Sequence, residues 1–170
     1  MMGGRRPASG AGSYFNASSN PRVAATGHRE RDMILEWSEH IAIDHASIDR
    51  DHRYMIHLID LLYNFPDNGH SLVDIYWLFC DLIDFMAVHF ASEEKIMADS
   101  QYPSMGAHVR EHDLLIGIYA LYFYEKGARK VNDRQAALND LSALFIHHIK
   151  TFDQPLALFC KDRQDYALCA

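Results

Sequence analysis

Two pairs of metal-capable side chains, each pair four residues apart, constrain this chain more than any other feature. His89 and Glu93 form the first pair, and His108 and His112 form the second. On an α-helix, residues four apart lie on one face, one turn above the other. Two helices joined by a tight turn at Tyr102-Pro103 can therefore aim imidazole and carboxylate groups at one point. The pattern predicts a metal site between helices.

Apolar residues recur at helical spacing in four segments, with no strand-like alternation. We expect helices from about residue 48 to 64, from a cap at Ser71 to about 98, from Pro103 to Gly127, and from the link at 128–132 towards Pro155. The expected inner positions, in chain order, are Ile48, His52, Met55, Ile59 and Leu62; Leu78, Leu82, Phe85, His89, Glu93 and Ile96; His108, His112, Leu115, Tyr119 and Tyr122; and Leu138, Leu141, Phe145, His148 and Phe152. Short links between such helices favour an all-α, up-down-up-down four-helix bundle.

The segments outside the four helices differ in composition. Residues 1–32 are rich in small and polar residues and have little apolar periodicity, which is typical of a disordered N-terminal extension. An organellar transit peptide is the alternative reading of its arginine- and serine-rich start. We expect an extended arm from Met33, lying over the core with Trp37 as its anchor. The bundle with its arm is expected over residues 33–160, and a C-terminal tail over 161–170.

Composition excludes some classes of function. The formal net charge is −7, and no basic stripe is present that could neutralise phosphates, so we expect no nucleic-acid partner. No apolar run is long enough for a membrane span, so no membrane insertion is expected. The three cysteines, Cys80, Cys160 and Cys169, form no C-x-x-C pair. This pattern favours the reducing cytoplasm and disfavours a thiolate metal site.

Histidine is unusually placed, because five of the eleven histidines fall on the inner positions of the four helices. A buried imidazole nitrogen without a partner costs about 1–3 kcal/mol. Shared metal ions would satisfy the five rings together with Glu93 and Asp153. Nitrogen and carboxylate ligands favour iron, with zinc, copper or manganese as alternatives. Seven ligands exceed the needs of one ion and suit two ions bridged by carboxylates. The Glu-x-x-His pattern of ferritin-like di-iron bundles is absent.

In combination, these residues resemble one family, the hemerythrins, and among them the single-domain bacterial proteins. The resemblance covers about Trp37 to Asp153. Four motifs carry it in order: Ile48-Asp49-Arg50-Asp51-His52, similar to the family's Ile-Asp-x-Gln-His; His89-Phe90-Ala91-Ser92-Glu93-Glu94, which matches His-Phe-x-x-Glu-Glu; His108-x-x-x-His112; and His148-Ile149-x-x-x-Asp153. Each pair alone is weak, but all of them at the family's intervals make a specific match.

The resemblance implies two non-haem iron ions. One iron would be bound by His108, His112 and His148, and the other, which keeps an open position, by His52 and His89. Glu93 and Asp153 would bridge the irons together with a solvent-derived oxo or hydroxo group. The implied function is reversible O2 binding, as a carrier, store or local sensor, and not catalysis. A dry O2 pocket is also implied, and our candidates for its wall are Met55, Phe85, Phe145 and Ile149, with plain core packing as the alternative for each.

The chain departs from the family pattern at several positions. Asp51 stands where the family usually has Gln, Leu144 where Trp is common, and Phe145 and Met55 where Leu is typical. These departures bear on O2 affinity and on the rate of autoxidation. The alternative functions are a di-iron enzyme that reacts with peroxide or nitric oxide, and an iron-handling protein. We expect no further acid or base group beside the open iron, which favours binding; an O2-consuming partner protein stays unknown.

One member of the ligand set does not follow from helical periodicity. His148 and Asp153 are five residues apart, about 140° around an ideal helix. Asp153 is therefore predicted from the resemblance alone, with a distorted turn before Pro155 as the hypothesis that would bring the two together. The remaining histidines are expected on the surface or in the arm: His28, His40, His45, His57, His70 and His147.

Overall fold

The structure, a computed structural model, describes residues 34–66, 72–127 and 131–162. Within these residues the chain is helical apart from the arm before residue 46 and the connections between helices. The elements, in chain order, are α1 (Ala46–Tyr63), α2 (Leu72–Ser100), α3 (Met105–Tyr122), the π-helical turn η1 (Phe123–Gly127), α4 (Val131–His148), the π-helical turn η2 (Ile149–Asp153) and α5 (Gln154–Asp162). The predicted all-α four-helix bundle is confirmed.

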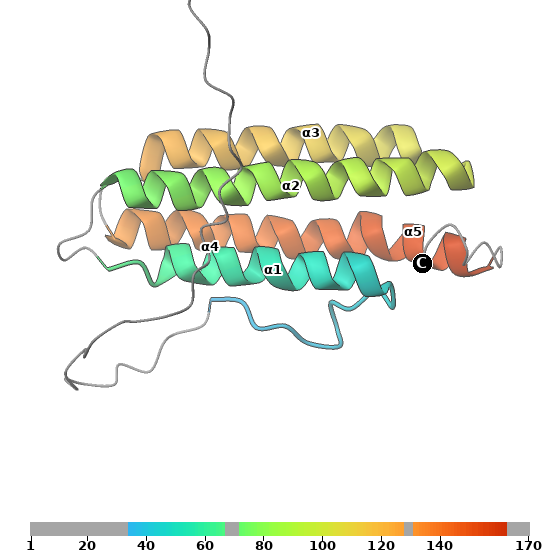
Figure 1. Cartoon of the computed structure of the whole chain (residues 1–170), viewed down its shortest axis with the longest axis horizontal. Helices are drawn as coiled ribbons and strands as arrows, with labels where there is room; N and C mark the ends of the chain where they lie inside the picture. The colour runs from blue at the N-terminus through green and yellow to red at the C-terminus, as the bar shows by residue number, and fades with distance from the viewer. Residues whose placement is uncertain (1–33, 67–71, 128–130, 163–170) are drawn as a thin grey trace, which may run out of the picture. The chain divides into compact units, whose positions relative to one another are not determined.

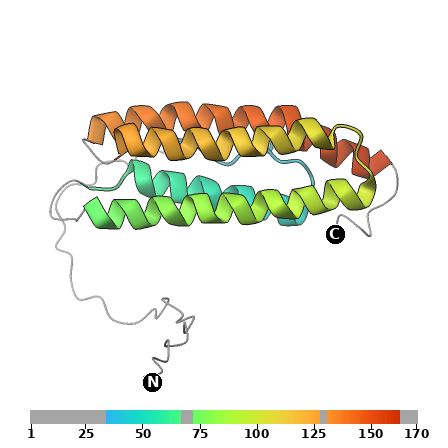
Figure 2. The ribbon, with the colours of Figure 1, turned by 90° about the horizontal axis from the view of Figure 1, so that it is seen from above.

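The four long helices alternate in direction along the chain, as expected (Figure 1, Figure 2). α1 packs against α2 and α4, and α3 packs against the same two helices, so the four surround one core. η2 and α5 continue α4 at the end of the bundle where α1 begins (Figure 1). In the described ranges, none of the helices combines the length and the apolarity that a membrane crossing needs.

The predicted inner faces are correct for three helices and rotated for α2. Every expected inner position of α1 is buried. On α3, and on α4 with its continuation η2, only the last ones, Tyr122 and Phe152, are half-buried. On α2 three expected positions are half-buried and the next residue is buried instead: Leu78 and Phe79, Phe85 and Met86, Ile96 and Met97. α2 also carries large apolar side chains on its exposed face, among them Trp77 and Val88, so the sequence does not mark the centre of its inner face.

The arm packs on the bundle as predicted, but Trp37 is not its most buried residue. Ile41 and Ile43 are buried, whereas Trp37 is half-buried, with the Arg53 guanidinium 4.4 Å from its ring centre in a cation–π contact. The carboxylate of Asp49 accepts a hydrogen bond of 2.9 Å from the Ile43 N–H. This bond ties the arm to the first turn of α1.

A Schellman motif ends α2 and turns the chain into α3. Gln101 has a left-handed φ of 56°, and its N–H donates to the Ala98 carbonyl at 3.2 Å. The N–H of Tyr102 donates to the Met97 carbonyl at 2.8 Å, which completes the motif. The turn predicted at Tyr102 and Pro103 is confirmed, and it sets the end of α2 beside the start of α3.

The hypothesis of a distorted turn before Pro155 is supported, because α4 widens there into the π-helical turn η2. The N–H of Gln154 donates to the carbonyl of Ile149, five residues earlier. Pro155 has no N–H, and its ring crowds the carbonyl four residues before it, which accounts for the widening. The wider turn brings residues five apart back to one face, so Asp153 is buried beside His148. The helix does not stop at Pro155 but continues as α5.

At the opposite end of the bundle, buried polar groups are bonded to backbone carbonyls. The hydroxyl of Tyr119 donates to the Leu141 carbonyl at 2.8 Å. Burial raises the pKa of Tyr119, which keeps this donor protonated. Arg134 is buried and donates to the carbonyls of Leu62 and Phe65 at 3.0 and 2.6 Å. Leu62 lies in the last turn of α1, whose carbonyls lack partners within the helix, so Arg134 helps to cap that end.

Several predictions concern residues outside the described ranges. They are the extension over residues 1–32, Met33, the cap at Ser71, His28, His70, Cys169 and the tail from residue 163 onward. Lys161 and Asp162, expected to begin the tail, belong to α5. The fourth helix begins at Val131, within the link expected at 128–132.

Candidate metal centre

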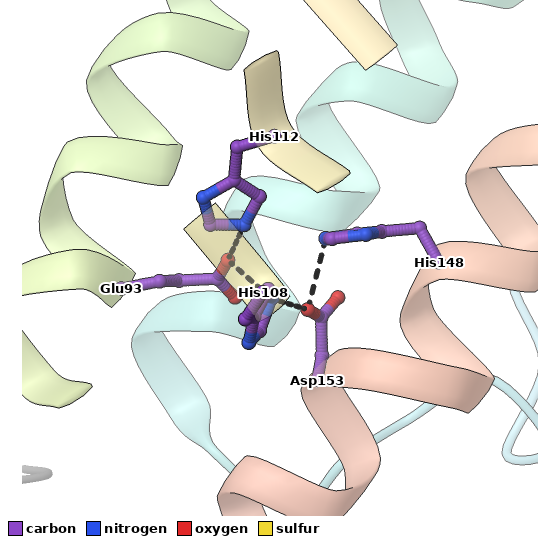
Figure 3. Close-up of side chains that lie close together, drawn as sticks. All are labelled: Glu93, His108, His112, His148 and Asp153. Carbon is purple, nitrogen blue, oxygen red and sulfur yellow. Dashed lines mark hydrogen bonds and ion pairs between the residues drawn. The ribbon is translucent and has the colours of Figure 1, made fainter. Parts of the chain in front are cut away.

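The seven side chains predicted as metal ligands lie together inside the bundle, at the end where α1 begins. They are His52 from α1, His89 and Glu93 from α2, His108 and His112 from α3, His148 from the end of α4, and Asp153 from η2. Each is at most 1% exposed. Figure 3 shows five of them pointing toward one another from three parts of the chain. Helical spacing aligns the pairs on α2 and α3, and the π-helical turn aligns the pair at the end of α4.

Glu93 lies between two groups of histidines and faces each with a different oxygen. Its Oε2 is 3.1 Å from Nε2 of His112 and 3.8 Å from Nε2 of His108. Its Oε1 is 3.5 Å from Nε2 of His89. The two oxygens of one carboxylate therefore point to opposite sides, as a bridging ligand requires.

Asp153 has the same divided arrangement. Its Oδ1 is 3.0 Å from Nε2 of both His108 and His148, and its Oδ2 is 3.3 Å from Nε2 of His52. The side chains thus form two adjoining groups. The three-histidine group contains His108, His112 and His148, and the two-histidine group contains His52 and His89. The two carboxylates stand between them.

Many of these buried atoms lack a hydrogen-bond partner among the described residues, although oppositely charged groups are near. Both ring nitrogens of His52, His89 and His148 are in this state, and so are both oxygens of Glu93. Leaving such groups unsatisfied costs about 1–3 kcal/mol each. Imidazole nitrogens and carboxylate oxygens converging without thiolate suit iron, zinc, copper or manganese. The residues therefore fit the two-metal site that the sequence predicts, because metal ions would supply the missing partners.

The two carboxyl groups differ electrostatically. Burial, reinforced by the nearby charge of Asp153, raises the pKa of Glu93 well above its ordinary value. Burial acts on Asp153 in the same way, but its contacts with His108, His148 and His52 outweigh this effect and hold the Asp153 pKa well below its ordinary value. The charge of Asp153 is therefore already balanced by imidazoles. The charge of Glu93 is not balanced in this way and needs a cation.

Aromatic rings pack around the histidines and hold them in place. Phe90 stacks on His112 with a centroid distance of 4.0 Å and an angle of 7° between the planes. Phe152 stacks on His148 at 5.5 Å. Phe90 belongs to the His-Phe-x-x-Glu-Glu motif, but no role was predicted for it. Its position beside His89, three residues before Glu93 on the inner face of α2, is the signal that could have identified it.

Two further carboxylates, which were given no role from the sequence, contact the outer ring nitrogens. Glu94 Oε1 lies 3.1 Å from Nδ1 of His112, and burial, only partly offset by this contact, lowers the pKa of His112. Asp51 Oδ2 lies 3.5 Å from Nδ1 of His89, and this contact lowers the pKa of Asp51. Asp51 lies on the far side of the His89 ring from Glu93, so the expectation of no further acid group beside the open iron stays a prediction.

Three of the four candidates for the pocket wall are fully buried. Met55, Phe145 and Ile149 are at most 1% exposed, and the ring edge of Phe145 meets His52 at a centroid distance of 5.5 Å. Phe85 is half-buried and packs instead against Tyr54, 4.7 Å between centroids. This position gives Phe85 no support as part of a wall.

The other described histidines lie apart from the centre, as expected. His40, His57 and His147 are exposed. His45, at the end of the arm, is buried, and its Nδ1 accepts a hydrogen bond from the Ile48 N–H at 3.4 Å. It therefore caps the N-terminus of α1.

Comparison with known proteins agrees with this geometry. The sequence profile of the Hemerythrin HHE cation binding domain matches residues 44–157. The chain is 26% identical to a bacteriohemerythrin of Stenotrophomonas maltophilia over 125 residues, which cover 73% of this chain and 80% of that protein. It is 28% identical to a bacteriohemerythrin of Pseudomonas paraeruginosa over 120 residues, covering 70% and 76% of the two chains.

A solved structure shares the fold. It is a crystal structure of a point mutant in which phenylalanine replaces leucine, 25% identical in sequence, and the two chains align with a TM-score of 0.64. The alignment covers 74% of this chain and 95% of the other. The profile match spans α1 to the first turn of α5 and includes all seven clustered side chains. This chain belongs to the hemerythrin family.

Proposed function

We propose that this protein binds O2 reversibly at a non-haem di-iron centre. The observation that carries the proposal is the division of Glu93 and Asp153, each of which directs one oxygen to the three-histidine group and the other to the two-histidine group. Two buried carboxylates shared in this way suit two cations held side by side. The ligand set that we propose is the predicted one: His52, His89, Glu93, His108, His112, His148 and Asp153.

The unequal number of imidazoles explains why one metal position would accept a further ligand. In the proposed set, His108, His112 and His148 complete one position, whereas His52 and His89 leave room at the other. The chemistry supplied by a bound pair of ferrous ions is the reversible transfer of two electrons to O2. The family context supports iron, because hemerythrins bind non-haem iron and are generally O2 binders and not enzymes.

The protein's own contribution is to keep the centre dry. Met55, Phe145 and Ile149 are fully buried apolar residues. We propose that they form the wall of the O2 pocket on the side of His52, which Phe145 contacts directly. Excluding water and anions prevents loss of electrons by routes that do not return O2. We propose no catalytic residue.

We place this function in the cytoplasm, where O2 is the only partner that we propose. Cys80 and Cys160 are free thiols, which fits a reducing compartment. Whether O2 is carried, stored or sensed depends on its affinity and on its release rate.

The decisive experiment is an anaerobic optical titration of the reduced, iron-loaded protein with O2, followed by deoxygenation. We expect an oxygen-dependent charge-transfer absorption that appears and disappears over several cycles, with two irons per chain. His89→Ala should abolish the absorption, whereas His57→Ala, an exposed histidine of the neighbouring helix, should leave it unchanged. A permanent change after one exposure, with turnover of added peroxide, would instead identify a di-iron enzyme. Iron that is bound and released without any response to O2 would identify an iron-handling protein.

A further inference from the structure

A half-buried carboxylate stands behind one of the proposed iron ligands. Asp51 lies on α1, directly before His52, and its side chain is 21% exposed. Its Oδ2 is 3.5 Å from Nδ1 of His89 on α2, while Nε2 of the same ring faces Glu93 on the inner side. His89 therefore lies between an inner and an outer carboxylate.

The two ring nitrogens of His89 have different tasks once a metal is bound. Nε2 must offer its lone pair to the metal, so the single proton of the neutral ring sits on Nδ1. Nδ1 is buried, and no hydrogen bond to it is made by any described residue. Asp51 Oδ2 is the acceptor within reach. The separation of 3.5 Å is longer than a typical hydrogen bond, and we expect it to shorten when a bound metal ion fixes the ring.

The other group has a matching arrangement. Nδ1 of His112 is 3.1 Å from Glu94, which is also partly exposed. The Nδ1 atoms of His52, His108 and His148 have no hydrogen-bond partner among the described residues. One histidine of each group thus has an outer carboxylate, and the other three do not.

We propose that Asp51 is a positioning residue for the two-histidine metal position, where it accepts a hydrogen bond from the Nδ1–H of His89 and fixes the ring so that Nε2 points at the metal. The inference rests on the proposed function, because it requires a metal ion at His52 and His89. Outer carboxylates fix the tautomer and orientation of a metal-binding histidine and raise its basicity. Removing such a partner typically lowers metal affinity about 10- to 100-fold.

Metal titrations of the metal-free protein with cobalt(II) separate the two positions. We expect the wild type to bind two ions per chain. Asp51→Ala should weaken one of them by about 10-fold or more, and Asp51→Asn should recover most of that loss, because its amide oxygen can accept the same hydrogen bond. Asp81→Asn is the matched control: it removes an exposed carboxylate on α2, about two turns from His89, and should change neither binding step.

Nuclear magnetic resonance of the zinc-loaded protein detects the Nδ1–H signals of individual histidines. A general loss of stability would not change one of these signals selectively. The Nδ1–H proton of His89 should be protected from exchange in the wild type and should shift in Asp51→Asn, while that of His112 stays in place. Glu94→Gln should produce the reverse pattern. Asp51→Asn also serves if Asp51→Ala does not fold.

The outcomes are distinguishable. A wild-type protein that takes up no pair of metal ions would overturn the proposed function, and the role of Asp51 with it. Normal uptake with unchanged affinity and an unchanged His89 signal in the Asp51 variants would overturn the inference alone. Equal losses in Asp51→Ala and Asp81→Asn would also overturn it.

Discussion

The two halves of this bundle treat buried polar groups in opposite ways. The end of the bundle around Leu62 and Tyr119 is here called the apolar half. There Tyr119 donates a hydrogen bond to the Leu141 carbonyl, and Arg134 donates to the carbonyls of Leu62 and Phe65. In the histidine half, formed by the seven clustered side chains, most ring nitrogens and both oxygens of Glu93 lack hydrogen bonds.

The difference shows what each half is built to do. In the apolar half Tyr119 and Arg134 are bonded without any ligand, so this half can provide the stability of the fold. The histidine half is complete only when cations fill it, because unsatisfied buried groups oppose folding. We therefore expect changes in the apolar half to act equally on metal-free and metal-loaded protein, and changes in the histidine half to act differently on the two.

Iron loading should have the largest effect. Ligands that bind only the folded state stabilise it by mass action, by about 4 kcal/mol for each ion at a free concentration 1,000 times its dissociation constant. Urea unfolding under anaerobic conditions, with and without ferrous iron, measures this gain. His89→Ala should reduce it by removing one position. An unfolding midpoint that does not respond to iron would contradict the comparison.

A cavity in the apolar half should destabilise both forms alike. Leu62→Ala removes a fully buried side chain about 15 Å along α1 from His52, and it should lower the free energy of unfolding by about 2–5 kcal/mol. Leu61→Ala is the matched control, because Leu61 is 38% exposed, and surface changes usually stay within about 0.5 kcal/mol. The number of irons bound should be two in both variants.

Glu93→Gln should stabilise the metal-free protein while weakening metal binding. The raised pKa of Glu93 means that the folded state holds the proton more tightly than the unfolded state does. Stability is therefore lost as pH rises above about 4.5, the ordinary value. Replacing the carboxyl group should raise the free energy of unfolding by about 1–3 kcal/mol near neutral pH. It should have no effect below about pH 4.5. Unfolding curves measured across pH test this profile.

Asp153→Asn should give the opposite sign in the metal-free protein. Because the folded-state pKa of Asp153 is lowered by its histidine contacts, ionised Asp153 contributes stability at neutral pH, and that contribution is lost as pH falls below its ordinary 3.8. The variant should therefore be less stable than the wild type at neutral pH, with the difference shrinking in acid. Two variants that shift stability in the same direction would refute this contrast.

The smallest effect is expected from Tyr119→Phe. It removes one buried hydrogen bond to the Leu141 carbonyl and should cost about 1 kcal/mol. Because Tyr119 belongs to the apolar half, the loss should be the same with and without iron. A loss confined to the loaded protein would show that the two halves are coupled.

Much of this was predictable because it depends on short-range spacing. Apolar residues three and four apart indicated four helices, and the inner stripe of α1 is buried as predicted. His89 with Glu93, and His108 with His112, required only that their segments be helical. Asp153 was different: it came from a resemblance, since a regular helix would turn it away from His148. Only the π-helical turn before Pro155 brings the two together.

The sequence by itself therefore determined the fold class and which candidate ligands share a helix face, because both follow from periodicity along single helices. The tertiary structure decided the rest: which face of α2 is central, which oxygen of Glu93 faces which histidine, and that Asp51 and Glu94 stand behind His89 and His112. These relations join residues on different helices, or, as at η2, depend on how a helix deforms. The spacing of residues within one segment predicts neither the contacts between helices nor the deformation of a helix.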